Sequence, residues 1–163
     1  MKRNRSMKKP DIGSAAPDFS LLDQNGETVT LSQFKGKSVV VYFYPKAMTP
    51  GCTTQACGIR DSQQAYAAAN TVVLALSPDQ PERLKKFEDK QDLNFTLLSD
   101  PDHAVADAYG VWGPKKFMGR EYDGIHRSTF IIDDKGILRE IMAKVKTKSH
   151  HEDVLAWIAV NLT

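Results

Sequence analysis

The sequence is sparing with sulfur and contains no long apolar run. Its 163 residues include only two cysteines, Cys52 and Cys57. Two cysteines cannot supply the several disulfides that stabilise small secreted scaffolds. No stretch approaches the roughly 18 consecutive apolar residues of a membrane-spanning helix, so we expect no membrane partner. The two thiols are therefore candidates for metal ligands, catalytic groups or buried core residues.

The chain also has no large excess of either charge. It carries 22 basic and 20 acidic side chains, for a formal net charge of +2. This balance gives no electrostatic reason to expect a nucleic-acid partner. The first ten residues, MKRNRSMKKP, are basic but precede no apolar segment, so they do not resemble a secretory signal. We expect residues 1–10 to form a disordered tail, residues 11–163 to form one domain, and the protein to be cytoplasmic.

Apolar patterning predicts alternating strands and helices. Residues 19–22 and 28–31, joined by a turn at Asn25 and Gly26, are typical of an N-terminal β-hairpin. Residues 38–44 and 71–77 are runs of β-branched and aromatic residues without alternation, which indicates strands buried on both faces. Further strands are predicted over residues 95–99, 127–133 and 136–143, helices over 52–69, 78–92, 100–110 and 149–161, and a glycine-rich loop over 111–124. This order predicts an α/β fold with a mixed central sheet flanked by helices.

Cys52 stands at a predicted strand-to-helix junction that can activate a thiol. The segment Thr49-Pro50-Gly51-Cys52 follows a strand and precedes residues that favour helix. At a helix N-terminus, free backbone N–H groups and the helix dipole stabilise a thiolate, which is the nucleophilic form of cysteine. Thr49 is a suitable capping residue, although its hydroxyl could instead face the sulfur or a substrate. The position therefore predicts a reactive Cys52.

Cys57 follows five positions later, a spacing that separates the two thiols in an intact helix. Five helical residues turn the side chains about 140° apart and rise about 7.5 Å. A disulfide needs Cα atoms within about 7 Å and converging Cβ vectors. Part of the helix must therefore unwind before the two cysteines can join. Cys57 could equally be a small buried residue without a redox role, because it stands between Ala56 and Gly58.

The four histidines do not suggest a metal site. Only His150 and His151 are neighbours, and adjacent residues do not share one face of a helix. We interpret this pair as the solvated first turn of the last helix, which Ser149 caps. His103 and His126 are isolated, and we expect them to be surface or hydrogen-bonded residues. We expect neither a metal nor another cofactor.

The stretch YPKAMTPGCTTQACGIRD resembles the active-site motif of the peroxiredoxins, Pro-x-x-x-Thr-x-x-Cys. Pro45, Thr49 and Cys52 match it, and a second cysteine five positions later is characteristic of the peroxiredoxin Q, or bacterioferritin comigratory protein, group. The resemblance continues through NFTLLSDPDH, YGVWGPKKFMG and GIHRSTFIID and covers about residue 12 to the end. Gln55 departs from the pattern, because many members have glutamate there.

The resemblance implies a thioredoxin-like fold and the reduction of hydrogen peroxide and organic hydroperoxides. Cys52 would be the peroxidatic cysteine, and Cys57 would resolve its sulfenic acid as an intramolecular disulfide. Thioredoxin, or glutaredoxin in some members, would reduce that disulfide. Thr49 would orient the peroxide, Pro45 would shield the thiolate from water, and Arg127 would stabilise the thiolate and polarise the peroxide. No metal, flavin or nicotinamide is implied, and we expect a monomer because no distal cysteine is present.

Two other functions remain open on the sequence. A thioredoxin-type disulfide oxidoreductase would use Cys-x-x-Cys, whereas four residues intervene here. A non-enzymatic holdase built on the same scaffold would not need Cys52. Apart from the resemblance, Arg127 is typical of a surface ion pair at the start of a strand, because nothing in linear spacing places it near Cys52.

Overall fold

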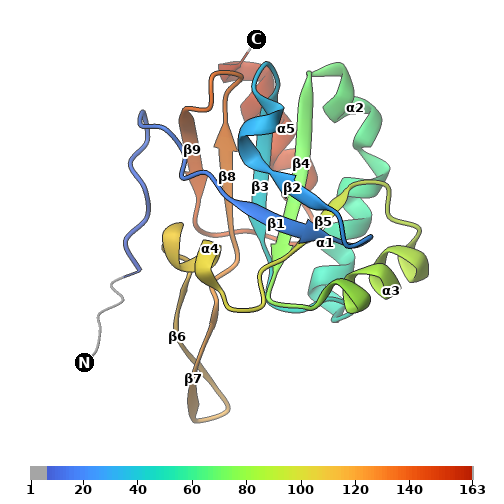
Figure 1. Ribbon diagram of the computed structural model, residues 1–163, viewed down its shortest axis with the longest axis vertical. Helices are drawn as coiled ribbons and strands as arrows, with labels where there is room; N and C mark the ends of the chain where they lie inside the picture. Colours follow the sequence, from blue (N-terminus) through green and yellow to red (C-terminus); the bar gives the residue numbers. More distant parts are fainter. Residues whose placement is uncertain (1–6, 163) are drawn as a thin grey trace.

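The computed structural model describes residues 7–162 and contains a seven-stranded mixed sheet (Figure 1). The strands are β1 (Ser20–Asp23), β2 (Thr28–Thr30), β3 (Ser38–Phe43), β4 (Thr71–Ser77), β5 (Thr96–Ser99), β8 (Ser128–Ile132) and β9 (Leu138–Met142). Their order in the sheet is β2-β1-β5-β4-β3-β8-β9. Strands β3, β4 and β5 are parallel, while β1 and β8 run antiparallel to their neighbours β5 and β3. The predicted mixed sheet is confirmed.

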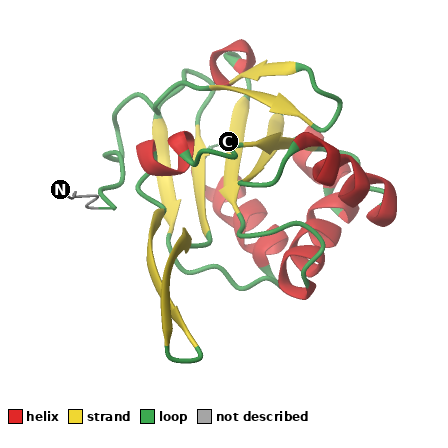
Figure 2. Ribbon diagram, turned by 60° about the horizontal axis from the view of Figure 1, so that its bottom comes forward, coloured by secondary structure: helices red, strands yellow, loops and turns green. Residues whose placement is uncertain are grey.

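Two apolar layers cover the two faces of this sheet. The helices are η1 (Leu31–Phe34), α1 (Pro50–Asp61), α2 (Gln63–Ala68), α3 (Pro81–Gln91), α4 (Ala104–Ala108) and α5 (His150–Asn161). Tyr42 packs in the layer that includes α1, α2, α3 and α5, whereas its neighbour Phe43 packs in the layer that includes α4. Side chains alternate across a strand, so β3 contributes to both layers, as predicted for a fully buried strand. Figure 2 shows the longer helices gathered on one side of the sheet.

The predicted helix over residues 52–69 is wrong in its bounds. Helix α1 begins at Pro50, and a proline is well tolerated at the first helical position because it loses no hydrogen bond there. The backbone N–H of Ser62 bonds to the carbonyl of Ile59, three residues back, and α1 ends at the preceding residue, Asp61. A separate helix, α2, follows. The consequence for the site is that Cys52 lies inside the first turn of α1 rather than at its first residue.

The predicted glycine-rich loop over residues 111–124 is also wrong, because this segment forms a β-hairpin. Strands β6 (Trp112–Phe117) and β7 (Arg120–Ile125) pair antiparallel and project from the body of the molecule (Figure 1). Met118 and Gly119 form the two-residue turn, with φ angles of 55° and 77°. Two consecutive positive φ angles are typical of the turn whose twist matches paired strands.

The two ends of the chain agree with the sequence where the structure describes them. The N-terminal hairpin is confirmed, with Ser20 opposite Thr30. Residues 1–6 of the expected basic tail lie outside the described residues, so its disorder and the domain boundary stay predictions. Within the described part, the backbone of Lys8 and Lys9 passes so close to Gly110 that a side chain at this glycine would overlap it. Among residues 7–162, no helix has the length and apolar character needed to cross a membrane.

Candidate active site

Cys52 is the third residue of α1, and its side chain is only 2% exposed. Thr49 is the N-cap and Pro50 the first helical residue, so the cysteine lies in the turn whose backbone N–H groups have no acceptor within the helix. Strand β3 ends at Phe43, and a six-residue loop leads from it into the helix. The predicted placement of Cys52 at a helix N-terminus is confirmed.

Arg127 brings a positive charge to the sulfur of Cys52. Its Nη2 lies 3.4 Å from Sγ of Cys52, and its Nη1 donates a 2.5 Å hydrogen bond to Oε1 of Gln55. Phe43 pairs with Ser128, so the residue before β8 lies at the same end of the sheet as the start of α1. The alternative of a surface ion pair is wrong, because Arg127 contacts no carboxylate within residues 7–162. A guanidinium this close favours the thiolate form of a cysteine.

The hydrogen bonds continue from Gln55 into the protein interior. Nε2 of Gln55 lies 3.0 Å from Nδ1 of His150, and Nε2 of His150 lies 2.7 Å from Oγ1 of Thr129. The interpretation of His150 as a solvated residue is wrong, since its side chain is 1% exposed and its ring packs edge-on against Tyr42. Burial lowers the pKa of His150 to about 4, below its ordinary value of 6.5. The ring is therefore neutral at pH 7.

The loop before α1 is fixed by a carboxylate and a guanidinium from outside it. The backbone N–H of Ala47 donates to Oδ2 of Asp79, and its carbonyl accepts from Nη2 of Arg83, at 2.8 and 2.9 Å. Thr49 makes no side-chain cap bond, and its hydroxyl donates to the carbonyl of Lys46 at 2.8 Å. The Thr49 oxygen keeps its lone pairs available for another donor.

In the same loop, Pro45 and Met48 each follow a buried residue, Tyr44 and Ala47. Pro45 is half-buried and directly follows the fully buried Tyr44. Met48 has a φ of 69°, a left-handed conformation that costs a non-glycine residue energy and that clusters at functional sites. The segment between β3 and α1 therefore has a defined shape, which its contacts with Asp79 maintain.

A protein-family model described as the AhpC/TSA family matches residues 12–141. The chain belongs to this family. Curated relatives place it among the peroxiredoxins: it is 55% identical to peroxiredoxin Bcp of Escherichia coli K12, over 90% of this chain and 94% of the relative. It is 54% identical to a putative peroxiredoxin bcp of Haemophilus influenzae, over 90% of this chain and 95% of the relative.

Solved peroxiredoxin structures share the fold. A cysteine-to-serine variant of Xylella fastidiosa PrxQ superposes with a TM-score of 0.90 at 29% identity, covering 96% of this chain and 99% of the other. A structure of the Xanthomonas campestris bacterioferritin comigratory protein, described for its alkyl peroxide reduction activity, gives a TM-score of 0.87 at 32% identity. It covers 94% of this chain and all of the other. The predicted thioredoxin-like fold is confirmed.

In this peroxiredoxin both cysteines are free thiols, and both lie within the continuous helix α1. Cys57 is half-buried, and its Sγ lies 3.6 Å from Oε1 of Gln91 on α3. The neighbouring Gly58 faces the imidazole of His151, and a methyl group on this glycine would overlap the ring. Helix α1 is thus packed closely beside the second thiol, in the conformation that keeps the two cysteines apart.

A second cation of the peroxiredoxin site comes from the β6–β7 hairpin. Nζ of Lys115 donates to the carbonyl of Ile125 at 2.8 Å, which closes the base of the hairpin two residues before Arg127. Burial first, and then the charge of Arg127, lower the pKa of Lys115, while Cys52 acts in the opposite direction. The ammonium group is therefore within electrostatic reach of both Arg127 and the sulfur.

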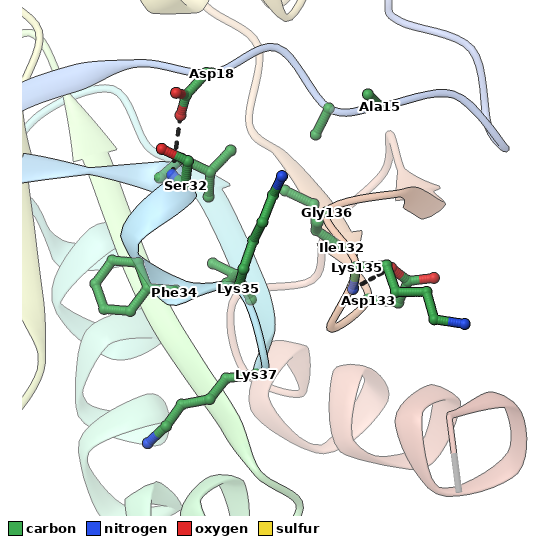
Figure 3. Close-up of a pocket in the computed structure, with 13 residues that line it drawn as sticks. Ala15, Asp18, Ser32, Phe34, Lys35, Lys37, Ile132, Asp133, Lys135 and Gly136 are labelled. Carbon is green, nitrogen blue, oxygen red and sulfur yellow. Dashed lines mark hydrogen bonds between the residues drawn. The ribbon is translucent and has the colours of Figure 1, made fainter.

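A hollow of about 220 Å³ lies near the other end of the sheet (Figure 3). Val39 and Ile132, which pair across β3 and β8, line it. Cys52 lies beyond the opposite end of β3, which finishes at Phe43. Phe43 is four residues, or about 13 Å, along the strand from Val39. The lining also contains Lys35, Lys37 and Lys135, whose amino groups point in different directions in Figure 3. This hollow is separate from the cysteine site.

Sequence reasoning missed three polar residues that complete the site. The signal for Gln55 was present, because residues three apart on a helix are neighbours and Gln55 follows Cys52 by three. His150 and Lys115 come from α5 and β6, and no local pattern links either of them to α1. Only the packing of the strands and helices brings these side chains together.

Proposed function

We propose that this peroxiredoxin is a thiol-dependent peroxidase whose peroxidatic residue is Cys52. The observation that carries the proposal is the 3.4 Å contact between Nη2 of Arg127 and Sγ of Cys52, in the first turn of α1. The guanidinium and the helix N-terminus both favour the thiolate, which is the form that attacks a peroxide. They also favour the negative charge that moves onto the leaving oxygen.

In the first step the Cys52 thiolate attacks the terminal oxygen of a hydroperoxide. The O–O bond breaks, the leaving oxygen takes up a proton to give water or an alcohol, and Cys52 becomes a sulfenic acid. The Thr49 hydroxyl donates to Lys46, so its oxygen accepts from the O–H of the substrate and orients the O–O bond. Pro45 shields the thiolate from water, and Arg127 donates to the peroxide oxygens.

In the second step Cys57 resolves the sulfenic acid. Its thiol attacks the Cys52 sulfur, water leaves, and an intramolecular disulfide forms. The helical separation of about 7.5 Å along the axis means that α1 unwinds locally before this step. A dithiol reductant then returns both cysteines to thiols and becomes a disulfide itself.

The family assigns peroxide substrates and a thioredoxin-type reductant. The Xanthomonas campestris relative is described for alkyl peroxide reduction, and we assign hydrogen peroxide and organic hydroperoxides to this chain. Thioredoxin is the proposed reductant, with glutaredoxin as the alternative. We further propose a cytoplasmic monomer that uses no metal or other cofactor and binds neither nucleic acid nor membranes.

Peroxide-dependent oxidation of thioredoxin tests the proposal. Wild type should turn over, and Cys52→Ser should show no activity above background. Cys57→Ser should lose thioredoxin-linked turnover but still form a sulfenic acid that dimedone traps. Activity retained in Cys52→Ser would contradict the proposal. Strong insulin reduction without peroxide would favour a disulfide oxidoreductase instead, and a holdase role would be untouched by either substitution.

A further inference from the structure

We propose that His150 is a positioning residue: it fixes the orientation of the Gln55 amide and thereby holds Arg127 against Cys52. The inference rests on the proposed role of Cys52 as the reacting thiol. It concerns a continuous row of side chains, Arg127, Gln55, His150 and Thr129, that leads from the sulfur into the interior.

The donor and acceptor roles along this row follow from its first member. A guanidinium has only N–H donors, so the Gln55 atom that faces Nη1 of Arg127 must be the carbonyl oxygen. The amide NH2 group of Gln55 then faces Nδ1 of His150 at 3.0 Å. Because the NH2 group can only donate, Nδ1 must carry a lone pair and no proton.

The tautomer of His150 is thereby determined. A neutral imidazole with an unprotonated Nδ1 carries its proton on Nε2, which donates to Oγ1 of Thr129 at 2.7 Å. Thr129 lies in β8, two residues after Arg127, so the same strand supports both ends of the row. Each hydrogen bond in the row thus requires the one before it.

Burial makes this assignment of donors and acceptors strict. The side chains of Gln55 and Thr129 are fully buried and that of His150 is 1% exposed, so water cannot replace a lost partner. A flipped Gln55 amide would point its NH2 group at the guanidinium, donor against donor, and would push Arg127 away from the sulfur. A carboxylate at position 55 would accept from Arg127 in either orientation. The amide therefore needs a histidine lone pair on its far side, whereas a carboxylate would not.

The test compares Thr129→Val, Thr129→Ser and His150→Leu in a Cys57→Ser background, where Cys52 is the only thiol. The readouts are the second-order rate with hydrogen peroxide and the rate of alkylation by iodoacetamide at pH 7, which reports the thiolate. We expect Thr129→Val and His150→Leu to lower both rates about tenfold, as for one lost buried hydrogen bond. Thr129→Ser keeps the hydroxyl and should stay within about twofold of the parent.

Two controls separate positioning from general damage. Thr71→Val removes a buried hydroxyl at the far end of the sheet and should leave both rates unchanged. In a Gln55→Glu background Thr129→Val should change the rates less than about twofold, because a carboxylate has no wrong orientation. An equal loss in both backgrounds would show that Thr129 acts only through packing and would overturn the proposal.

Nitrogen-15 NMR of the histidine rings gives a direct readout that needs no activity. The expected signature is a protonated Nε2 and an unprotonated Nδ1 in His150 of the wild-type protein, and a proton on Nδ1 would refute the inference. A wild-type protein that alkylates rapidly at Cys52 but reduces no peroxide would contradict the proposed function alone. The tautomer and the Thr129 variants would still decide the role of His150.

Discussion

Arg127 contacts a neutral amide where a carboxylate would be the usual partner of a guanidinium. Gln55 accepts one hydrogen bond from it but brings no negative charge. The charge of Arg127 is therefore left to act on Cys52, with Lys115 as a second cation within reach. At the scale of single residues, the site is a buried sulfur in contact with the half-buried guanidinium of Arg127.

Substitution of Arg127 should separate the effect of its charge from that of its geometry. We expect Arg127→Met to lower the second-order rate with hydrogen peroxide about 100-fold, because donors aimed at developing charge are lost. Arg127→Lys keeps the charge but loses the planar pair of donors. Its rate should lie between those of the wild type and Arg127→Met. Stopped-flow measurement of the peroxide rate in the three proteins tests this prediction. Equal rates for wild type and Arg127→Met would show that the guanidinium is not part of the reaction.

His150 should make the fold more sensitive to acid. Its pKa is about 4 in the folded protein because burial disfavours the charged ring, whereas an unfolded histidine titrates near 6.5. Between pH 4 and pH 6.5, His150 is protonated in the unfolded chain but neutral in the folded protein. The free energy of unfolding therefore falls as the pH drops from about 6.5 toward 4, by at most roughly 3 kcal/mol.

Urea denaturation at pH 7, 6 and 5 measures this effect, with His150→Leu as the control. The wild-type free energy of unfolding should decrease more steeply over this range than that of the variant. Contributions that are common to both proteins cancel in the comparison. The same pH dependence in both proteins would show that His150 does not take up the proton.

At the scale of elements, the junction of β3 and α1 was predictable and its partners were not. An apolar run, a proline and a threonine before helix-favouring residues are local signals, and they placed Cys52 correctly at a helix start. Arg127 directly precedes β8, 75 positions from Cys52, and its contact depends on the antiparallel pairing of β8 with β3. Without the family resemblance, spacing alone gave no reason to join them.

The β6–β7 hairpin shows a different limit of sequence reasoning. Its strands contain Gly113, Pro114, Gly124 and several charged residues, so they do not show the apolar alternation of a half-buried strand. The usable signal was the two-residue turn that ends in Gly119, between segments of equal length. Within residues 7–162 the two strands pair with each other and with no third strand, and the hairpin projects from the body, so its exposed residues cover no apolar layer there.

Oxidation should loosen α1 specifically. We expect hydrogen–deuterium exchange of the amides in residues 53–61 to speed up when peroxide converts the two thiols to a disulfide, because that bond cannot form across an intact helix. Exchange in α3 and in the central strands should change little. Cys57→Ser treated with the same peroxide is the control and should retain protection in α1. Unchanged exchange in the oxidised wild type would mean that the cysteines meet without unwinding.

At the scale of the whole molecule, the class of fold was accessible from the sequence but the strand order was not. Alternating strands and helices predicted a mixed α/β sheet, and the unbroken apolar runs identified β3 and β4 as interior strands. The position of β1 beside β5 could not be predicted, because it depends on a pairing between segments more than 70 residues apart. Such pairings depend on how both faces of the sheet pack against their covering layers.

The oxidised protein should be less stable than the reduced protein. Closing so short a loop stabilises a fold by only about 2 kcal/mol. Unwinding α1 around Cys57 disturbs Ala56 and Ile59, both fully buried, and a large apolar side chain contributes about 1.5–3 kcal/mol when buried. We therefore expect a lower Tm by calorimetry after stoichiometric peroxide treatment, and no such change in Cys57→Ser. A higher Tm in the oxidised wild type would contradict this account.

The fit of Gly58 against the His151 ring has a consequence for the timing of catalysis. Glycine is the poorest helix former after proline, costing about 1 kcal/mol relative to alanine, so α1 is intrinsically weak directly beside Cys57. The imidazole of His151, from α5, packs directly against this turn. We therefore expect the contact between α5 and α1 to slow the local unwinding that must come before a disulfide between Cys52 and Cys57.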